Sequence, residues 1–120
     1  MERSFIMSDC IFCKIINREI PSKPVYENDR VYAFHDINPE APVHVLIVPK
    51  EHIASHNELT VENVGIMKDI HLAANEIAKQ LGVAETGYRL INNCGTHAGQ
   101  TVFHLHYHLV GGKPMGSKIL

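Results

Sequence analysis

The chain has 120 residues, of which 45% are hydrophobic and 20% are charged, and its formal net charge is −2. This length suits one domain with a single core, and a slightly acidic balance without a run of Lys or Arg argues against a nucleic-acid or anionic-membrane binder. No apolar stretch approaches the roughly 18 residues of a membrane-spanning helix, and an odd number of cysteines fits a reducing compartment. We therefore expect a cytoplasmic protein.

The predicted elements begin after an N-terminal extension, residues 1–9, and fill one domain over residues 10–120. A short helix is expected over residues 11–18, closed by Ile20-Pro21. Strands over residues 25–27 and 31–34 are predicted to form a hairpin, because turn residues lie between them. A proline-punctuated loop, residues 36–42, then leads to a strand over residues 43–48, which Pro49 ends.

One long helix is predicted over residues 60–81, with Thr60 as its N-cap and Gly82 as the left-handed residue that follows it. Its apolar positions recur at helical spacing, at Val61, Val64, Met67, Ile70, Ala74, Ile77, Ala78 and Leu81. Two further strands are expected over residues 88–92 and 102–110. This order predicts the α+β class: an antiparallel sheet packed on one long helix, with a short N-terminal helix.

Three histidines alternate in the last predicted strand, at His104, His106 and His108. Because successive side chains of a strand point to opposite faces, the three imidazoles should share one face. The preceding loop, residues 93–101, offers backbone amides and two glycines, which suits it to bind an anion. The strand is therefore predicted to be an active site or a metal site.

The central histidine, His106, is best placed to act as a nucleophile. A neutral imidazole attacks phosphorus well near pH 7 if one ring nitrogen is held as N–H and the other presents a lone pair. His108 could donate a hydrogen bond to a phosphoryl oxygen, and His44, on another predicted strand, could converge on the same face.

These residues fall into a longer pattern that resembles the histidine-triad family, in its nucleotide-binding branch close to the nucleoside phosphoramidases. The pattern reads Asn93-x-Gly95-x-x-x-Gly99-Gln100-Thr101-Val102-x-His104-x-His106-x-His108. Shorter blocks match in order: Ile11-Phe12-x-Lys14-Ile15, Glu19-Ile20-Pro21, Phe34-x-Asp36-Ile37-x-Pro39, Pro42-x-His44 and Pro49-Lys50-x-His52. The resemblance implies an antiparallel α+β fold, a homodimer, and hydrolysis or transfer at the α-phosphorus of a nucleotide.

The resemblance also implies roles for single residues. His106 would be the covalent nucleophile, His108 and His44 would complete the phosphate pocket, and Thr101 would lie near the leaving group. The further phosphate or nucleotide contacts would be Asn93, Gly99, Gln100 and Val102. Asp36 would accept the ribose hydroxyls, although an Asx turn is the alternative. The base would lie against Ile11, Phe12, Phe34 and Ile37, for which an ordinary core position is the alternative.

A second group of residues begins with Cys10-x-x-Cys13, which by itself fits either a metal site or two buried cysteines. Zinc-containing members of the superfamily imply His52 and His104 as the remaining ligands of a structural, four-coordinate zinc site. Phosphate chemistry would then be left to His44, His106 and His108. Zinc bound by the three alternating histidines is disfavoured, because they span ~13 Å along a strand.

Together with these residues, the resemblance implies a hydrolase acting on purine nucleoside 5′-phosphoramidates or aminoacyl adenylates through a nucleotidyl-histidine intermediate. A dinucleoside polyphosphate hydrolase is one alternative, and a non-catalytic nucleotide-binding or interaction module is the other. His97, inside the glycine loop, could add a donor to the leaving group or could be solvated.

Overall fold

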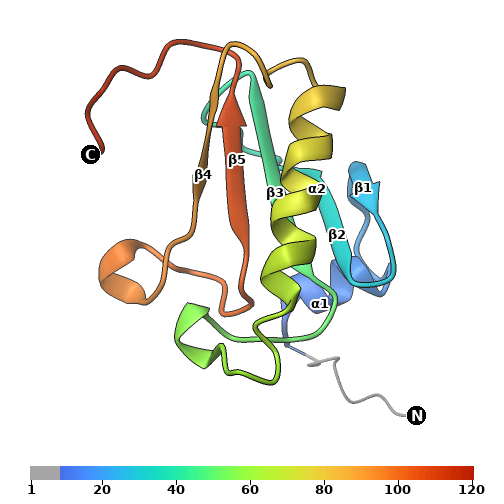
Figure 1. The fold of residues 1–120 in the computed structure, drawn as a ribbon. Helices are drawn as coiled ribbons and strands as arrows, with labels where there is room; N and C mark the ends of the chain where they lie inside the picture. Colours follow the sequence, from blue (N-terminus) through green and yellow to red (C-terminus); the bar gives the residue numbers. More distant parts are fainter. Residues whose placement is uncertain (1–8) are drawn as a thin grey trace.

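The computed structural model describes residues 9–120, so residues 1–8 of the predicted extension lie outside the described part. One five-stranded sheet has the order β1-β2-β3-β5-β4, and every neighbouring pair is antiparallel (Figure 1). The elements are α1 (Ile11–Ile16), β1 (Pro24–Glu27), β2 (Val31–His35), β3 (Val43–Pro49), η1 (His56–Glu58), α2 (Ile66–Gln80), β4 (Tyr88–Ile91), η2 (Thr96–Ala98) and β5 (Tyr107–Gly111). The predicted α+β class, with one long and one short helix, is confirmed.

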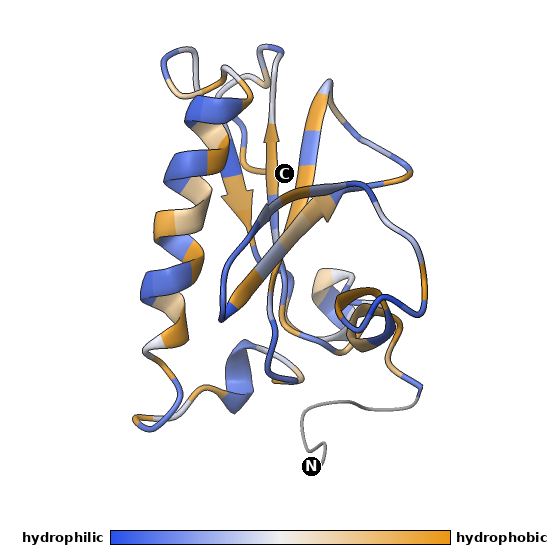
Figure 2. Ribbon diagram, turned by 90° about the vertical axis from the view of Figure 1, so that its right-hand side faces the viewer, coloured by the Kyte–Doolittle hydropathy of each residue, from blue (hydrophilic) through white to orange (hydrophobic). Residues whose placement is uncertain are grey.

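Helix α2 covers one face of the sheet. Its inner side packs on inward-facing residues of the strands, and the largest core contains Val31, Val45, Ile47, Ile70, Ile77 and Leu109. Figure 2 shows hydrophilic and hydrophobic bands alternating along α2, whereas the strands are mainly hydrophobic. In the described part of the chain, no helix is long and apolar enough to cross a membrane.

Helix α1 covers part of the opposite face, over β2 and β3. This second core contains Phe12, Cys13 and Ile15 from the helix side, and Tyr32, Phe34, Leu46 and Val48 from the strands. Because side chains alternate along a strand, His44 shares this face with Leu46, and His108 shares it with Val110. The site described below therefore lies on the face of the sheet that carries α1.

The long helix begins later than the sequence predicts, at Ile66 rather than near Thr60. Thr60 does act as a cap, because its Oγ1 accepts from the amides of Glu62 and Asn63, but it caps a run of turns over residues 61–65. Val61 is consequently 88% exposed and Val64 is 46% exposed. The predicted C-terminus is close: Gly82 has φ +77, and the amide of Val83 donates to the Ala78 carbonyl, as in a Schellman motif.

The predicted strand over residues 102–110 is shorter in the structure, because β5 starts only at Tyr107. Tyr107 pairs with Ile47 of β3, and the β3–β5 pairing does not extend to Pro49, which has no amide hydrogen to give to a strand ladder. The Pro49 carbonyl instead accepts from Nε2 of His104 at 2.8 Å, and the Leu105 amide donates to Ile53 O. A side chain thus replaces the ladder bond, and two of the three alternating histidines precede the strand.

Candidate active site and metal cluster

His44 and His108 form a hydrogen-bonded pair across β3 and β5. The strand register places His108 opposite Leu46 and His44 opposite Val110, so the two imidazoles are diagonal neighbours. Nδ1 of His44 accepts from the Glu40 amide at 3.0 Å, which places the proton of a neutral His44 ring on Nε2. That Nε2 therefore donates to Nδ1 of His108 at 2.9 Å. His108 is left with its own proton on Nε2, available as a donor.

His106 has the opposite arrangement of proton and lone pair. Its Nδ1 donates to the main-chain carbonyl of His104 at 2.7 Å, so its Nε2 carries the lone pair. The ring centroid is 5.0 Å from that of Phe12 and 5.2 Å from that of His108, with edge-on contacts in both cases. The contacts hold the His106 ring, with its lone pair on Nε2, next to the His108 ring and the proton on its Nε2.

Burial keeps these imidazoles neutral. Desolvation lowers the pKa of His106 below its ordinary value, against the opposing effect of the His104 carbonyl. The pKa of His108 falls to about 4, first because of burial and then because of the neighbouring His106 and His44 rings. At neutral pH both rings are therefore uncharged, which is the form a histidine nucleophile and its neighbouring donor need.

A cleft of about 690 Å³ opens beside the histidine pair, between the β3-β5-β4 face and the C-terminal segment. It is lined by Asp36, Asn38, Glu40, Ala41, His44, Arg89, Ile91, Asn93, His108, Val110, Lys113, Pro114 and Met115. Asp36 makes the Asx turn that was the alternative to its ribose role, since its Oδ1 accepts from the Asn38 amide at 2.8 Å. Its Oδ2 lies 3.5 Å from Nε2 of His44. The carboxylate thus makes the turn and borders the cleft.

The glycine loop is held by its own glutamine. The Gln100 side chain is buried; its Oε1 accepts from the Gly95 amide, and its Nε2 donates to the carbonyls of Ala54 and Val102. Gly99 ends η2 with φ +85, a conformation that a side chain would strain. The predicted contact residue Gln100 therefore uses its side chain to shape the loop.

Thr101 and Val102 border a second, smaller cavity of about 430 Å³ next to Cys10 and His52. Ile11 lines the same cavity and is 46% exposed, and Ile37 is 89% exposed. Phe12 and Phe34, the other predicted base contacts, are buried in the second core with their rings 5.7 Å apart. The four apolar residues thus divide into two core residues and two that are open to a ligand.

The four predicted metal ligands come together at the start of α1, in what we call the thiol cluster: Cys10, Cys13, His52 and His104. Nδ1 of His104 lies 3.4 Å from Cys10 Sγ and 3.5 Å from Cys13 Sγ, and Nδ1 of His52 lies 3.3 Å from Cys13 Sγ. Tetrahedral zinc with ordinary bond lengths would separate nitrogen and sulfur ligands by about 3.6 Å. The four ligand atoms all lie within 4.8 Å of one another.

The donor chemistry of the thiol cluster also fits a metal. His104 gives its Nε2 proton to the Pro49 carbonyl, so the lone pair on Nδ1 faces the two sulfurs. Burial lowers the pKa of His52 and brings that of His104 to about 4, so neither imidazole holds a competing proton at neutral pH. Residues that are 94 positions apart in the chain thus form one set of four ligands that could hold a metal.

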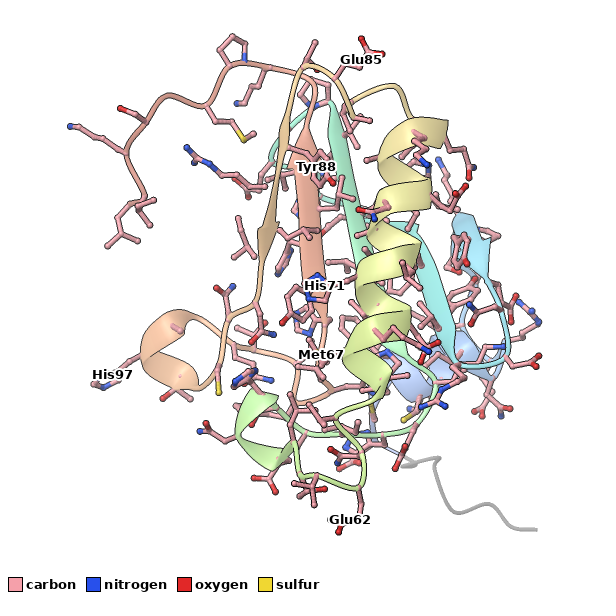
Figure 3. All side chains as sticks on the ribbon, viewed as in Figure 1. Glu62, Met67, His71, Glu85, Tyr88 and His97 are labelled. Carbon is pink, nitrogen blue, oxygen red and sulfur yellow. The ribbon has the colours of Figure 1, made fainter. Side chains whose placement is uncertain are left out.

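Some functional contacts could not be read from residue types. Glu40 acts through its amide and Pro49 through its carbonyl, and main-chain groups leave no mark in a sequence. Asn92 donates to the His106 carbonyl at 3.0 Å, and only its place at the end of a strand before the loop hinted at a role. His97, whose role the sequence left open, points away from the sheet at the tip of η2 (Figure 3).

Comparisons with known proteins agree with this geometry. The domain model described as "Scavenger mRNA decapping enzyme C-term binding" matches residues 9–119. The chain is 49% identical to the purine nucleoside phosphoramidase of Escherichia coli K12 over 108 residues, covering 90% of this chain and 91% of that protein. A HIT family hydrolase from Clostridium thermocellum shares 64% identity with a TM-score of 0.94, covering 95% and 99% of the two chains. A histidine triad protein from Clostridium difficile shares 52% identity with a TM-score of 0.90, covering 98% and 99%.

Proposed function

Because this chain belongs to the histidine-triad (HIT) family, we propose that it is a hydrolase cleaving purine nucleoside 5′-phosphoramidates and aminoacyl adenylates at the α-phosphorus. The observation that supports this most directly is the hydrogen bond from His106 Nδ1 to the His104 carbonyl, which leaves a lone pair on Nε2. A binding module would have no need of a neutral imidazole held in this way. The name of the Escherichia coli relative supports the choice of substrate class.

In the proposed reaction, Nε2 of His106 attacks the α-phosphorus as the bond to the leaving group breaks, which is the P–N bond of a phosphoramidate or the P–O bond of an aminoacyl adenylate. A nucleotidyl-histidine forms, and the positive charge that develops on the imidazole is stabilised through the Nδ1–H bond to the His104 carbonyl. An amine leaves with a proton taken from water, whereas a carboxylate leaves without one. We assign the Thr101 hydroxyl to the leaving-group side of the site. Water then attacks the same phosphorus and gives up a proton to the solvent, as the P–N bond to His106 breaks; the nucleoside monophosphate is released and the neutral ring is restored.

The surrounding residues hold the substrate. Nε2–H of His108 donates to a phosphoryl oxygen, and His44 keeps His108 in the tautomer that allows this. The amides of the loop bind further phosphoryl oxygens, with Asn93, Gly99, Gln100 and Val102 as its contact residues. Asp36 accepts the ribose hydroxyls, while Ile11 and Ile37 cover the base beside Phe12 and Phe34. A purine is favoured because it buries more apolar surface than a pyrimidine.

The thiol cluster is proposed to hold a structural zinc ion. Four protein ligands leave no open coordination position for a substrate, so the ion would cross-link α1 to the segments that carry His52 and His104. Thiolate ligands need reduced cysteines, which supports the cytoplasm as the place of action. Among the described strands β4 pairs with β5 alone and so forms an edge of the sheet, and we propose that the protein is a homodimer that covers this edge.

A panel of substrates tests the proposal. Adenosine 5′-phosphoramidate and an aminoacyl adenylate should be turned over at least tenfold faster than a dinucleoside polyphosphate, with the wild type and His106→Ala assayed in parallel. Faster turnover of the dinucleoside polyphosphate would favour the alternative that the protein is a dinucleoside polyphosphate hydrolase. Tight nucleotide binding without turnover of any substrate would mark the protein as a binding module.

A further inference from the structure

His104 belongs to both parts of the molecule described above. Its imidazole completes the thiol cluster, with Nδ1 facing both sulfurs and Nε2 fixed on the Pro49 carbonyl. Its main-chain carbonyl accepts the Nδ1 proton of His106 at 2.7 Å. The side chain is fully buried, with 0% exposure. A single residue therefore links the ligand set to the group that fixes the proton on the nucleophile.

The segment that carries this carbonyl is not held by the sheet. Strand β5 begins at Tyr107, so residues 104–106 lie ahead of the ladder. In the described part of the chain, their main chain is held by the Leu105 amide on Ile53 O and by Asn92 on His106 O, and neither bond reaches the His104 carbonyl. The position of that carbonyl therefore depends on where the His104 ring is fixed.

We propose that the thiol cluster is a positioning device for the nucleophile. By fixing the His104 ring it holds the His104 carbonyl in place, and that carbonyl keeps the proton of His106 on Nδ1 and the lone pair on Nε2. This inference rests on the proposed function, because it assigns His106 as the attacking group. On this proposal, Cys10, Cys13 and His52 are positioning residues, because they act through His104 and do not contact the substrate.

The coupling follows from the chemistry of a neutral imidazole. The ring has one proton, and the hydrogen bond made by one nitrogen decides which nitrogen holds it. If the His104 carbonyl moves out of reach, Nδ1 of His106 loses its acceptor, and the ring populates the other tautomer and other rotations. In that tautomer Nε2 carries the proton and cannot attack. Nucleotide binding, which the proposed function places in the cleft and the loop, should change little.

The test uses His52→Asn in the full-length protein, because the His52 ring contacts Cys13 and His104 but not His106. Zinc per chain, the nucleotide Kd, single-turnover rate and the ¹⁵N resonances of His106 are measured together. We expect the variant to lose zinc and its single-turnover rate to fall by roughly 10–100-fold. Losses of this size are typical when a residue that orients a metal ligand is replaced. The Kd should change less than about threefold, and the ¹⁵N shifts should move from one tautomer to a mixture.

Two further variants separate positioning from loss of stability. Ile70→Val, in the α2 core, lowers stability away from both sites and should leave the rate, the zinc content and the tautomer unchanged. His52→Cys supplies another zinc ligand and should recover zinc, rate and tautomer together. If His52→Asn does not fold, zinc titration of the reduced wild type gives the same answer, since the His106 resonances should follow the metal stoichiometry.

Loss of zinc with an unchanged rate and a single His106 tautomer would overturn the proposal and leave the cluster as a structural cross-link. Retention of zinc in His52→Asn would overturn the ligand assignment. Either outcome is distinct from failure of the proposed function, which would appear as full turnover in His106→Ala.

Discussion

Among residues 9–120, two groups of side chains bring potential metal ligands close together, yet their chemistry differs. One is the thiol cluster, and the other is the set Asp36, His44 and His108, here called the cleft cluster; in each, the ligand atoms lie within 4.8 Å of one another. In the thiol cluster, His104 donates Nε2–H to a carbonyl and turns a lone pair to the sulfurs. In the cleft cluster, the Glu40 amide occupies Nδ1 of His44, so Nε2 must hold the proton.

The difference teaches that backbone partners decide which histidines can bind a metal. A metal on Nε2 of His44 would move that ring's proton to Nδ1, where it would face the amide hydrogen of Glu40. It would also break the 2.9 Å bond to His108. In the proposed function the cleft cluster passes hydrogen bonds toward a phosphate, whereas the thiol cluster has the lone pairs that could hold a cation. The tautomer of His106 is fixed by the main-chain carbonyl of His104, a residue of the thiol cluster.

The largest expected effect comes from the residue between the two clusters. His106→Ala removes the attacking nitrogen, so kcat should fall by roughly 10³-fold or more while nucleotide still binds. Calorimetric titration with a nucleoside monophosphate, alongside steady-state kinetics, checks both halves of this expectation. Near-wild-type turnover would remove His106 from the mechanism.

His44→Ala tests the cleft cluster alone. Loss of His44 frees the tautomer of His108 and weakens its hydrogen bond to the phosphoryl group, so kcat should fall by about 10²-fold, as for the loss of one oriented donor. Zinc content should stay at the wild-type value, because the two clusters share no ligand. Metal analysis of the purified variant is the matched measurement, and a loss of zinc would show that the clusters are not separate.

Asp36→Ala should act on specificity. A charge-assisted hydrogen bond to a ribose hydroxyl contributes about 1.5–3 kcal/mol, so we expect the wild type to prefer ribonucleotides by roughly tenfold or more. The variant should lose that preference with little change in kcat on a good substrate. Competition between AMP and an analogue without either hydroxyl measures the ratio. Equal binding of the two by the wild type would leave Asp36 as a turn residue alone.

The smallest effect concerns pH. Burial lowers the pKa of His108 to about 4, so the ring stays neutral as pH falls from 7 toward 5 and gains a proton only as pH falls through about 4. An unfolded histidine titrates near 6.5, so the contribution of His108 to folding stability is complete above that pH and is lost as pH falls through the folded pKa. NMR titration of His108 should show this low pKa. Titration near 6.5 would contradict the burial of this ring beside His106 and His44.

Much of the fold followed from periodicity and turn chemistry. The hairpin of β1 and β2 forms where Asn28 was expected to turn the chain, and Gly82 ends α2 as predicted. The start of α2 was misplaced because Thr60 has the chemistry of an N-cap whether a helix or a turn follows it. The start of β5 was misplaced because the His104 side chain, and not a strand amide, bonds to the Pro49 carbonyl.

The residues of the site could be predicted from the sequence, but their hydrogen-bonded states could not. Residue types and spacing nominated the alternating histidines and Cys10-x-x-Cys13, the family resemblance added His52 and His104 as ligands, and the structure brings each set together. The tautomers could not be predicted, because they depend on main-chain groups at Glu40, Pro49 and His104 that any residue could supply. The cleft wall formed by Lys113 and Met115 was missed for a similar reason, since nothing in that segment signals a contact with β4 and β5.

The most direct test of the account is to trap the covalent intermediate. The wild type would be mixed with an adenylate carrying an activated leaving group, so that hydrolysis of the intermediate limits turnover, then quenched within milliseconds and analysed by peptide mass spectrometry. We predict one adenylyl group per chain, located on His106, that decays at the rate of steady-state turnover. An adduct on His44 or His108, or product release with no adduct at any time point, would contradict the assignment of His106 as the nucleophile.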